Sequence, residues 1–213
     1  MWFSGSIDFG EISATNWILL AVLAACAAVL FGIARARRQW TARMLANAAI
    51  CMALAFVLSY VRLFRLPQGG SVTAASLLPI IAFAYGYGLG PGLAVGVAYG
   101  FLQMIQDPWI VSPVQAALDY PLAFAAIALA ALARRLPERW GWLVAIALGG
   151  LGRFVCHVLS GVVFFAEYAE GTGLSPFVYS VSYNAFVFVD LVICAVVMAF
   201  PQVRGALKKM TAK

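Results

Sequence analysis

Long apolar runs separated by short polar loops dominate the chain and restrict it to one class of protein. They fill most of the 213 residues, so that 64% of the sequence is hydrophobic and only 10% is charged. A water-soluble fold of this size would expose large apolar patches, because it lacks the polar residues needed to cover its surface. The sequence therefore predicts an all-α integral membrane protein with a single membrane domain over residues 1–213.

Seven of these runs are candidates for membrane-spanning helices. A span needs about 20 mostly apolar residues, or fewer where the helix is short or broken. The third and fourth candidates are short, and only the turn-forming sequence GYGLGPG separates them, which favours a compact bundle. The expected spans lie at 15–34, 44–64, 73–88, 91–106, 113–134, 142–166 and 176–200.

The positive charges predict how the chain crosses the membrane. Most lysines and arginines fall in three clusters, RARRQWTAR (35–43), ARRLPER (133–139) and RGALKK (204–209). Seven alternating spans place all three clusters on the same side, which we expect to be the cytoplasm. The N-terminus is then outside and the C-terminus cytoplasmic. The net charge of +6 arises largely from these anchoring clusters, so we expect no nucleic-acid partner.

The sequence offers no motif for catalysis or metal binding. It contains one histidine and no HExxH, no GxSxG elbow and no GxxxxGK[ST] phosphate-binding loop. The four cysteines fall within apolar runs without the paired spacing of metal ligands, and we interpret them as small buried hydrophobic residues. They are Cys26, Cys51, Cys156 and Cys194. We therefore expect no metal, no enzymatic activity and no ATPase site of the chain's own.

A small polar set remains inside the expected spans and gathers towards the outer ends of the last three. It consists of Gln115, Asp119, Tyr120, Arg153, His157, Ser160, Tyr179, Ser180, Tyr183 and Asn184. Arg153, His157 and Gly161 follow one another at four-residue spacing and share one helix face. Together with aromatic residues of the outer loops, this set predicts an outward-facing pocket for a small, polar, cationic ring compound.

The same residues also admit a purely structural interpretation. An ion pair between Asp119 and Arg153 would hold the fifth and sixth spans together, with His157 capping the pair. Tyrosine and tryptophan near span ends are also typical of the interfacial belt. Asp190 lies deeper in the seventh span, where the sequence offers it no obvious partner and no role.

Three stretches of the chain have a recognisable pattern: LPQGGSVTAASLLPIIAFAYGYGLGPGLAVGVAYGFLQ (66–103), VQAALDYPLAF (114–124), and RFVCHVLSGVVFFAEYA together with PFVYSVSYNA. They resemble the thiamine-binding S components of bacterial energy-coupling-factor (ECF) vitamin transporters. The most specific element is the H-x3-G and Y-x4-N combination that follows an acid–tyrosine pair. The resemblance implies an S-component-like core of six helices over 44–203, with one additional transmembrane helix at 15–34.

The resemblance also implies which residues contact the ligand, position by position. They are Asp119, Tyr120, Arg153, His157, Gly161, Phe165, Tyr179 and Asn184. The chain departs from the family pattern at two of them, since the acid is usually glutamate and the stacking aromatic can be tryptophan. A third departure is Gly70, which stands where some members carry a loop tryptophan.

For function, the resemblance implies a membrane subunit that captures thiamine from outside for ATP-driven import. Thiamine would be the transported ligand rather than a cofactor, and the loop at 65–72 would close over it as a lid. The implied partners are the ECF coupling transmembrane subunit and two ATPase subunits in the bacterial cell membrane. The alternatives are an S component for a different vitamin or a thiamine precursor, a non-transport membrane scaffold, and an intramembrane enzyme.

A pair of alanines in the second span bears on the expected partner. Ala49 and Ala53 form a small-xxx-small pair, a spacing that permits close helix contact. The family uses an alanine pair here for docking to the coupling subunit. Ordinary packing within the chain explains the same spacing equally well.

Overall fold

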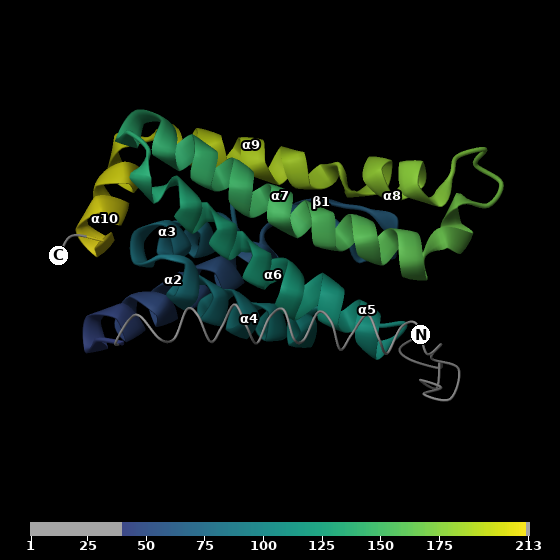
Figure 1. Cartoon of the computed structure of the whole chain (residues 1–213), viewed down its shortest axis with the longest axis horizontal. Coiled ribbons are helices and arrows are strands. Elements are labelled where there is room, and N and C mark those ends of the chain that lie inside the picture. Colours follow the sequence, from purple (N-terminus) through teal and green to yellow (C-terminus); the bar gives the residue numbers. More distant parts are fainter. Residues whose placement is uncertain (1–39, 212–213) are drawn as a thin grey trace.

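The computed structural model of the chain describes residues 40–211, so the helix expected at 15–34 lies outside the described residues. Four helical segments in the described part are long and apolar enough to cross a membrane. They are Ala42–Tyr60, Pro113–Arg135, Glu138–Phe164 and Pro176–Ala199. The expected class of all-α membrane protein is confirmed: helices run along the long axis of the molecule and pack into one bundle (Figure 1).

The first described helix, α2 (Ala42–Tyr60), buries one face and exposes the other. The hydroxyl of Thr41 accepts a hydrogen bond from the Met44 amide and caps its N-terminus. Its buried side chains recur at three- and four-residue spacing, from Met44 to Ser59. The opposite face carries exposed leucine, isoleucine and valine side chains, as expected for a helix that faces lipid.

A short β-hairpin follows α2, and here two expected span boundaries are wrong. Strand β1 (Arg62–Arg65) pairs with strand β2 (Ser71–Thr73), so the expected helix to residue 64 ends at Tyr60. Helix α3 begins at Leu78 rather than at 73. The turn between the strands contains the short 3-10 helix η2 (Pro67–Gly69), in which Gly69 has a φ of +88°. A proline and two glycines therefore replace helix with a tight turn.

Helices α3 (Leu78–Tyr87) and α4 (Leu89–Gln106) meet at Gly88, at the turn predicted from the sequence. Helix α3 is buried almost all round, because it packs against α2, α4, α7 and the fifth span. Helix α4 packs against the fifth span through glycines. A Cβ atom on Gly100 would lie 2.6 Å from the carbonyl oxygen of Tyr120, so only glycine permits this approach.

The fifth span is helical from end to end but irregular in its geometry. It consists of α5 (Pro113–Ala117), the π-helix η3 (Leu118–Leu122), α6 (Ala123–Ala126) and the 3-10 helix η4 (Ile127–Arg135). Pro121 lies inside the π-helix, and because it has no amide hydrogen it cannot continue the regular α-helical pattern. Single π-turns of this kind occur often at functional sites.

The last two spans complete the bundle. Helix α7 (Glu138–Phe164) has 27 residues and is therefore about 40 Å long. The 3-10 helix η5 (Ala166–Ala169) leads to α8 (Pro176–Asn184), which continues into α9 (Phe186–Ala199) with a break at Ala185. The cysteines Cys51 and Cys194 lie in the core, Cys156 is half-buried, and Cys26 is outside the described residues.

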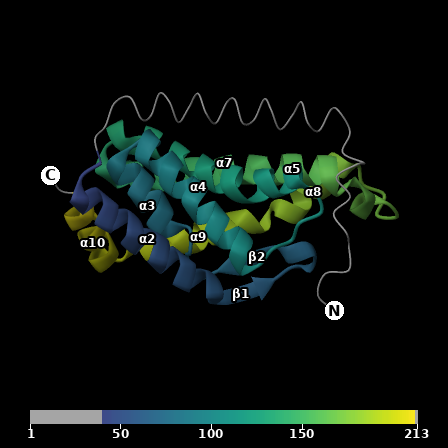
Figure 2. The same cartoon turned by 90° about the horizontal axis from the view of Figure 1, so that it is seen from below.

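Helix α10 (Pro201–Thr211) lies across one end of the bundle, and the hairpin, α5 and α8 lie towards the other end (Figures 1 and 2). The carbonyl oxygen of Met210 accepts hydrogen bonds from Tyr87 (2.9 Å) and Asn47 (3.2 Å). Arg43 donates to the carbonyl oxygen of Lys209 at 2.8 Å. These contacts attach α10 to α2 and α3.

Candidate functional site

A polar cavity lies between the hairpin, the fifth span, α7, α8 and α9. Its volume is about 150 Å³, roughly ten times the space that one water needs. All eight residues that the resemblance implies as ligand contacts line it, from three different spans. They are Asp119, Tyr120, Arg153, His157, Gly161, Phe165, Tyr179 and Asn184.

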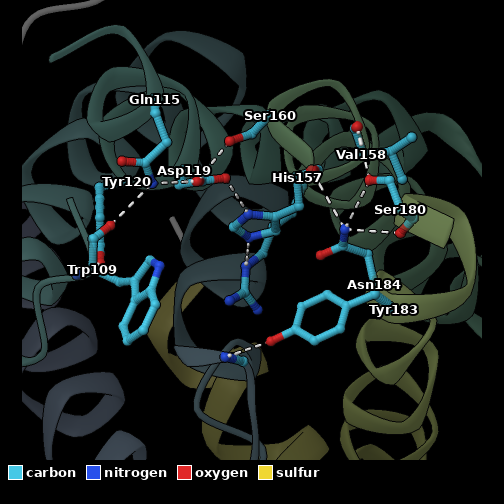
Figure 3. Close-up of polar contacts among 12 residues, drawn as sticks. Trp109, Gln115, Asp119, Tyr120, His157, Val158, Ser160, Ser180, Tyr183 and Asn184 are labelled. Carbon is cyan, nitrogen blue, oxygen red and sulfur yellow. Dashed lines mark hydrogen bonds and ion pairs between the residues drawn. The ribbon is translucent and has the colours of Figure 1, made fainter. Parts of the chain in front are cut away.

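The carboxylate of Asp119 is the centre of a hydrogen-bond network on one wall of this cavity (Figure 3). Its Oδ1 lies 2.8 Å from Nδ1 of His157. Its Oδ2 accepts hydrogen bonds from Gln115 at 2.6 Å and Ser160 at 2.7 Å. Gln115 is buried and also donates to the carbonyl oxygen of Trp109 at 3.0 Å. The network joins the fifth span, α7 and the Trp109 loop.

The contacts of His157 determine where its ring carries a proton. Nε of Arg153 donates to Nε2 of His157 at 3.1 Å, and a guanidinium nitrogen cannot accept. Nε2 is therefore unprotonated, which leaves the proton on Nδ1, where it is donated to Asp119. In this arrangement His157 is neutral and Asp119 is the charged partner.

The ion pair of Arg153 differs from the pair considered in the sequence analysis. Among the described residues its partner is Asp190 at 3.9 Å rather than Asp119. Asp190 also accepts hydrogen bonds from the backbone amide of Thr73 (2.8 Å) and from its hydroxyl (3.3 Å). The Asp119–Arg153 ion pair is therefore not formed, because Arg153 lies at the depth of Asp190 and only its Nε reaches His157.

Helix α8 approaches α7 at Gly161 and supplies the amide group of Asn184. A Cβ atom on Gly161 would lie 2.1 Å from the hydroxyl oxygen of Ser180, so the two helices can approach this closely only at glycine. The amide nitrogen of Asn184 donates to backbone carbonyl oxygens of Ser180 (2.9 Å) and His157 (3.4 Å). Its amide oxygen points towards the space between His157 and Tyr183 (Figure 3).

The hairpin covers the cavity and is attached to α8. Gln68 donates to the hydroxyl of Tyr179 at 3.2 Å, and the amide of Gly70 donates to the hydroxyl of Tyr183 at 3.1 Å. The Tyr183 hydroxyl in turn donates to the carbonyl oxygen of Pro67. The loop expected to act as a lid is therefore in contact with the opposite wall.

Aromatic side chains and one charge cluster line the outer part of the cavity. The rings of Trp109 and Tyr183 lie on opposite sides of the space beneath His157 (Figure 3). The Tyr120 hydroxyl accepts a hydrogen bond from the Trp109 amide at 2.7 Å. Asp107 forms ion pairs with Arg62 (2.8 Å) and with an exposed arginine of the same strand.

Phe165 occupies the end of α7, and a second aromatic ring supports it. Its ring stacks on that of Tyr168, with the ring centroids 5.8 Å apart. This contact places an aromatic surface where the resemblance implies the residue that stacks on the ligand. Within residues 40–211, no group of three or more His, Cys, Asp or Glu side chains is arranged to hold a metal ion.

The structure adds residues to the site that were not among the expected contacts. Gln115, Ser160 and Tyr183 belong to the polar set of the spans, and their hydrogen bonds bring them into the site. Thr73 and Asp190 form the floor of the cavity. The sequence indicates the importance of Asp190 in one way: it is a charged residue inside an apolar run, and a buried charge needs a partner.

The alanine pair expected to dock a partner lies away from this cavity. Ala49 and Ala53 are exposed among the described residues and lie on the face of α2 opposite its buried side chains. Packing within the described part of the chain therefore does not use these two residues.

Fold and cavity together define a class: a small multi-pass helical membrane protein with a polar cavity near one end of the bundle. A family model described as "Thiamine transporter protein (Thia_YuaJ)" matches residues 45–209. The chain belongs to this thiamine transporter family, as the resemblance predicted, and is a transport protein of the membrane.

Individual relatives agree with the family match. Thiamine transporter ThiT of Bacillus subtilis (strain 168) is 36% identical over 165 residues, which cover 70% of this chain and 85% of that protein. A protein of the same name from Lacticaseibacillus paracasei is 31% identical over 155 residues, covering 64% of this chain and 74% of that protein.

A solved structure supports the fold. The structure of ThiT from Listeria monocytogenes superposes with a TM-score of 0.66. The match covers 77% of this chain and 96% of that chain, with 23% sequence identity.

Proposed function

We propose that this chain is the substrate-binding membrane subunit that captures thiamine from outside the cell for import by an ECF complex. The observation that carries the proposal is the Asp119–His157 pair in a cavity walled by aromatic rings. A carboxylate suits a cationic heterocycle or its aminopyrimidine donors, and aromatic rings suit its flat faces. Two relatives that are at least 31% identical are named as thiamine transporters.

Each expected ligand residue receives a role in this proposal, and that of His157 is to orient the carboxylate of Asp119. Asp119 balances the charge of the ligand or accepts from its amino group, while Tyr179 and Asn184 supply hydrogen bonds. Phe165 and Tyr120 form the aromatic walls. Gly161 keeps α7 and α8 close together, and Arg153 holds His157 in its neutral form.

Transport itself depends on partners. We propose that the chain works with the coupling transmembrane subunit and two ATPase subunits, and that the exposed Ala49 and Ala53 contact the coupling subunit. The cavity then faces outside, and α10 with its basic residues lies on the cytoplasmic side of the cell membrane. The hairpin of β1 and β2 acts as the lid, which must leave Tyr179 and Tyr183 to admit a ligand.

Titration of the purified chain with thiamine tests the proposal directly. Intrinsic fluorescence should change in a saturable way, because the ring of Trp109 lines the cavity. Pyrimidine precursors and other vitamins are the competitors to compare. Saturable binding of another vitamin without binding of thiamine would refute the proposed ligand, and binding of neither would favour a scaffold.

A further inference from the structure

The floor of the cavity contains a buried ion pair whose acid belongs to none of the expected ligand contacts. Asp190 lies on α9, and its side chain is only 2% exposed. It faces Arg153 at 3.9 Å and accepts two hydrogen bonds from Thr73. The facing guanidinium and the two donors both favour the charged form of this buried carboxylate.

The charges that line the cavity leave one negative charge in excess. At the mouth, Asp107 pairs with Arg62, which also lines the cavity, and with Arg65, which is exposed and is not part of the lining. Deeper inside, Asp119 and Asp190 face the single charge of Arg153, and His157 is neutral because its Nε2 accepts from Arg153. Among the lining residues, three aspartates against two arginines give a net charge of −1. The charge of Arg65 lies outside the lining on an exposed side chain, where solvent screens it.

We propose that Asp190 determines the preference of this cavity for a cationic ligand. It neutralises Arg153, so the charge of Asp119 remains available to the ligand. Without Asp190, the positive charge of Arg153 would cancel that of Asp119 within the same cavity, and a cation would gain nothing over a neutral ring. The inference rests on the proposed function, because it takes the positively charged ring of thiamine as the ligand.

The central test compares two probes on two proteins. The probes are thiamine and an analogue in which a neutral thiophene replaces the charged thiazolium ring. In purified Asp190→Asn protein, we expect thiamine to bind about ten-fold more weakly, whereas the neutral analogue should change by no more than about two-fold. An equal loss for both probes would mean that Asp190 acts only on the structure, and the inference would be overturned.

A double variant keeps the test valid if Asp190→Asn fails to fold. A buried arginine without its partner is costly, but Arg153→Gln combined with Asp190→Asn removes both charges and leaves the excess of Asp119 in place. The double variant should bind thiamine more tightly than the single variant and should retain the preference for thiamine over the neutral analogue. Loss of that preference in a folded double variant overturns the inference.

Thr73→Val is the matched structural control. It removes the hydroxyl that contacts Asp190 but leaves every charge and the Thr73 backbone amide in place. We expect it to change the affinity for both probes by the same factor. If the wild-type protein binds neither probe, the proposed function is overturned together with this inference. If the wild-type protein binds thiamine but Asp190→Asn shows an unaltered preference between the probes, only the inference is overturned.

Discussion

At the scale of single residues, the site depends on which donors each acid receives. Asp119 receives three, from Gln115, Ser160 and His157, so its two oxygens are already oriented before any ligand enters. A carboxylate held in this way keeps its position without reorganisation. The ligand then meets an acceptor whose geometry is set by neighbouring side chains.

Replacing Asp119 by asparagine should strongly weaken thiamine binding. An amide has one oxygen instead of two, so at least one of the three donors loses its acceptor, and the cavity loses its excess negative charge. Hydrogen bonds to charged groups contribute about 1.5–3 kcal/mol each, which corresponds to a loss of affinity of about 10- to 100-fold. Isothermal titration with thiamine measures the change.

Asp119→Glu is the control for this substitution. Glutamate retains the charge but extends one methylene further into the cavity. We expect a smaller loss of affinity than for asparagine. Equal affinities for the wild-type protein and the asparagine variant would contradict the role assigned to this carboxylate.

Residue spacing and helix depth explain which parts of the site could be predicted from the sequence. Four-residue spacing placed Arg153 and His157 on one face, and the structure agrees. To predict the ion-pair partner of Arg153, one must compare how far each charged residue lies from the outer end of its span. Arg153 lies eleven residues from the end of α7 and Asp190 fourteen from the start of α8, whereas Asp119 lies only six from the start of α5. This comparison favours Asp190 at a rise of about 1.5 Å per residue.

At the scale of elements, the π-helix in the fifth span positions both Asp119 and Tyr120. The apolar run predicted a helix over 113–134, and a helical segment is present over Pro113–Arg135. Its local geometry depends on two features outside any periodicity: Pro121, which cannot donate, and the glycines of α4, which allow backbone contact. The hairpin is not predicted by the apolar pattern, because its outer residues, 61–64 and Thr73, continue the apolar runs of the flanking helices.

The contact between α4 and the π-helix makes Gly100 a sensitive position. In Gly100→Ala the new Cβ would lie 2.6 Å from the carbonyl oxygen of Tyr120, so the two segments must separate. Overpacking of this kind costs about 1–3 kcal/mol, and we expect a lower melting temperature together with weaker thiamine binding. Thermal unfolding monitored by circular dichroism measures the stability.

Gly205→Ala in α10 provides a matched comparison. Among the described residues, no atom outside the backbone of α10 itself lies within 4 Å of a Cβ added there, so the same substitution should be neutral or should stabilise the helix by up to about 1 kcal/mol. A similar loss of stability in both variants would indicate that the glycine contact with Tyr120 is not what the first substitution disturbs.

At the scale of the whole molecule, the cavity and the surface that we propose for partner contact lie apart. Residues of the hairpin, the fifth span, α7, α8 and α9 line the cavity, whereas Ala49 and Ala53 lie on the exposed face of α2. Burial within the chain accounts for the other face of α2, from Met44 to Ser59. A helix that exposes small residues to lipid provides a surface on which another helix can pack closely.

This separation predicts that docking can be removed without loss of thiamine binding. In the double variant Ala49→Leu and Ala53→Leu, two larger side chains would block close helix contact while leaving the cavity untouched. Purified variant protein should bind thiamine like the wild type. Cells that produce it together with the ECF coupling and ATPase subunits should take up little thiamine. Ala147→Leu, at an exposed alanine of α7, is the control and should preserve uptake. Full uptake by the α2 variant would place the docking surface elsewhere.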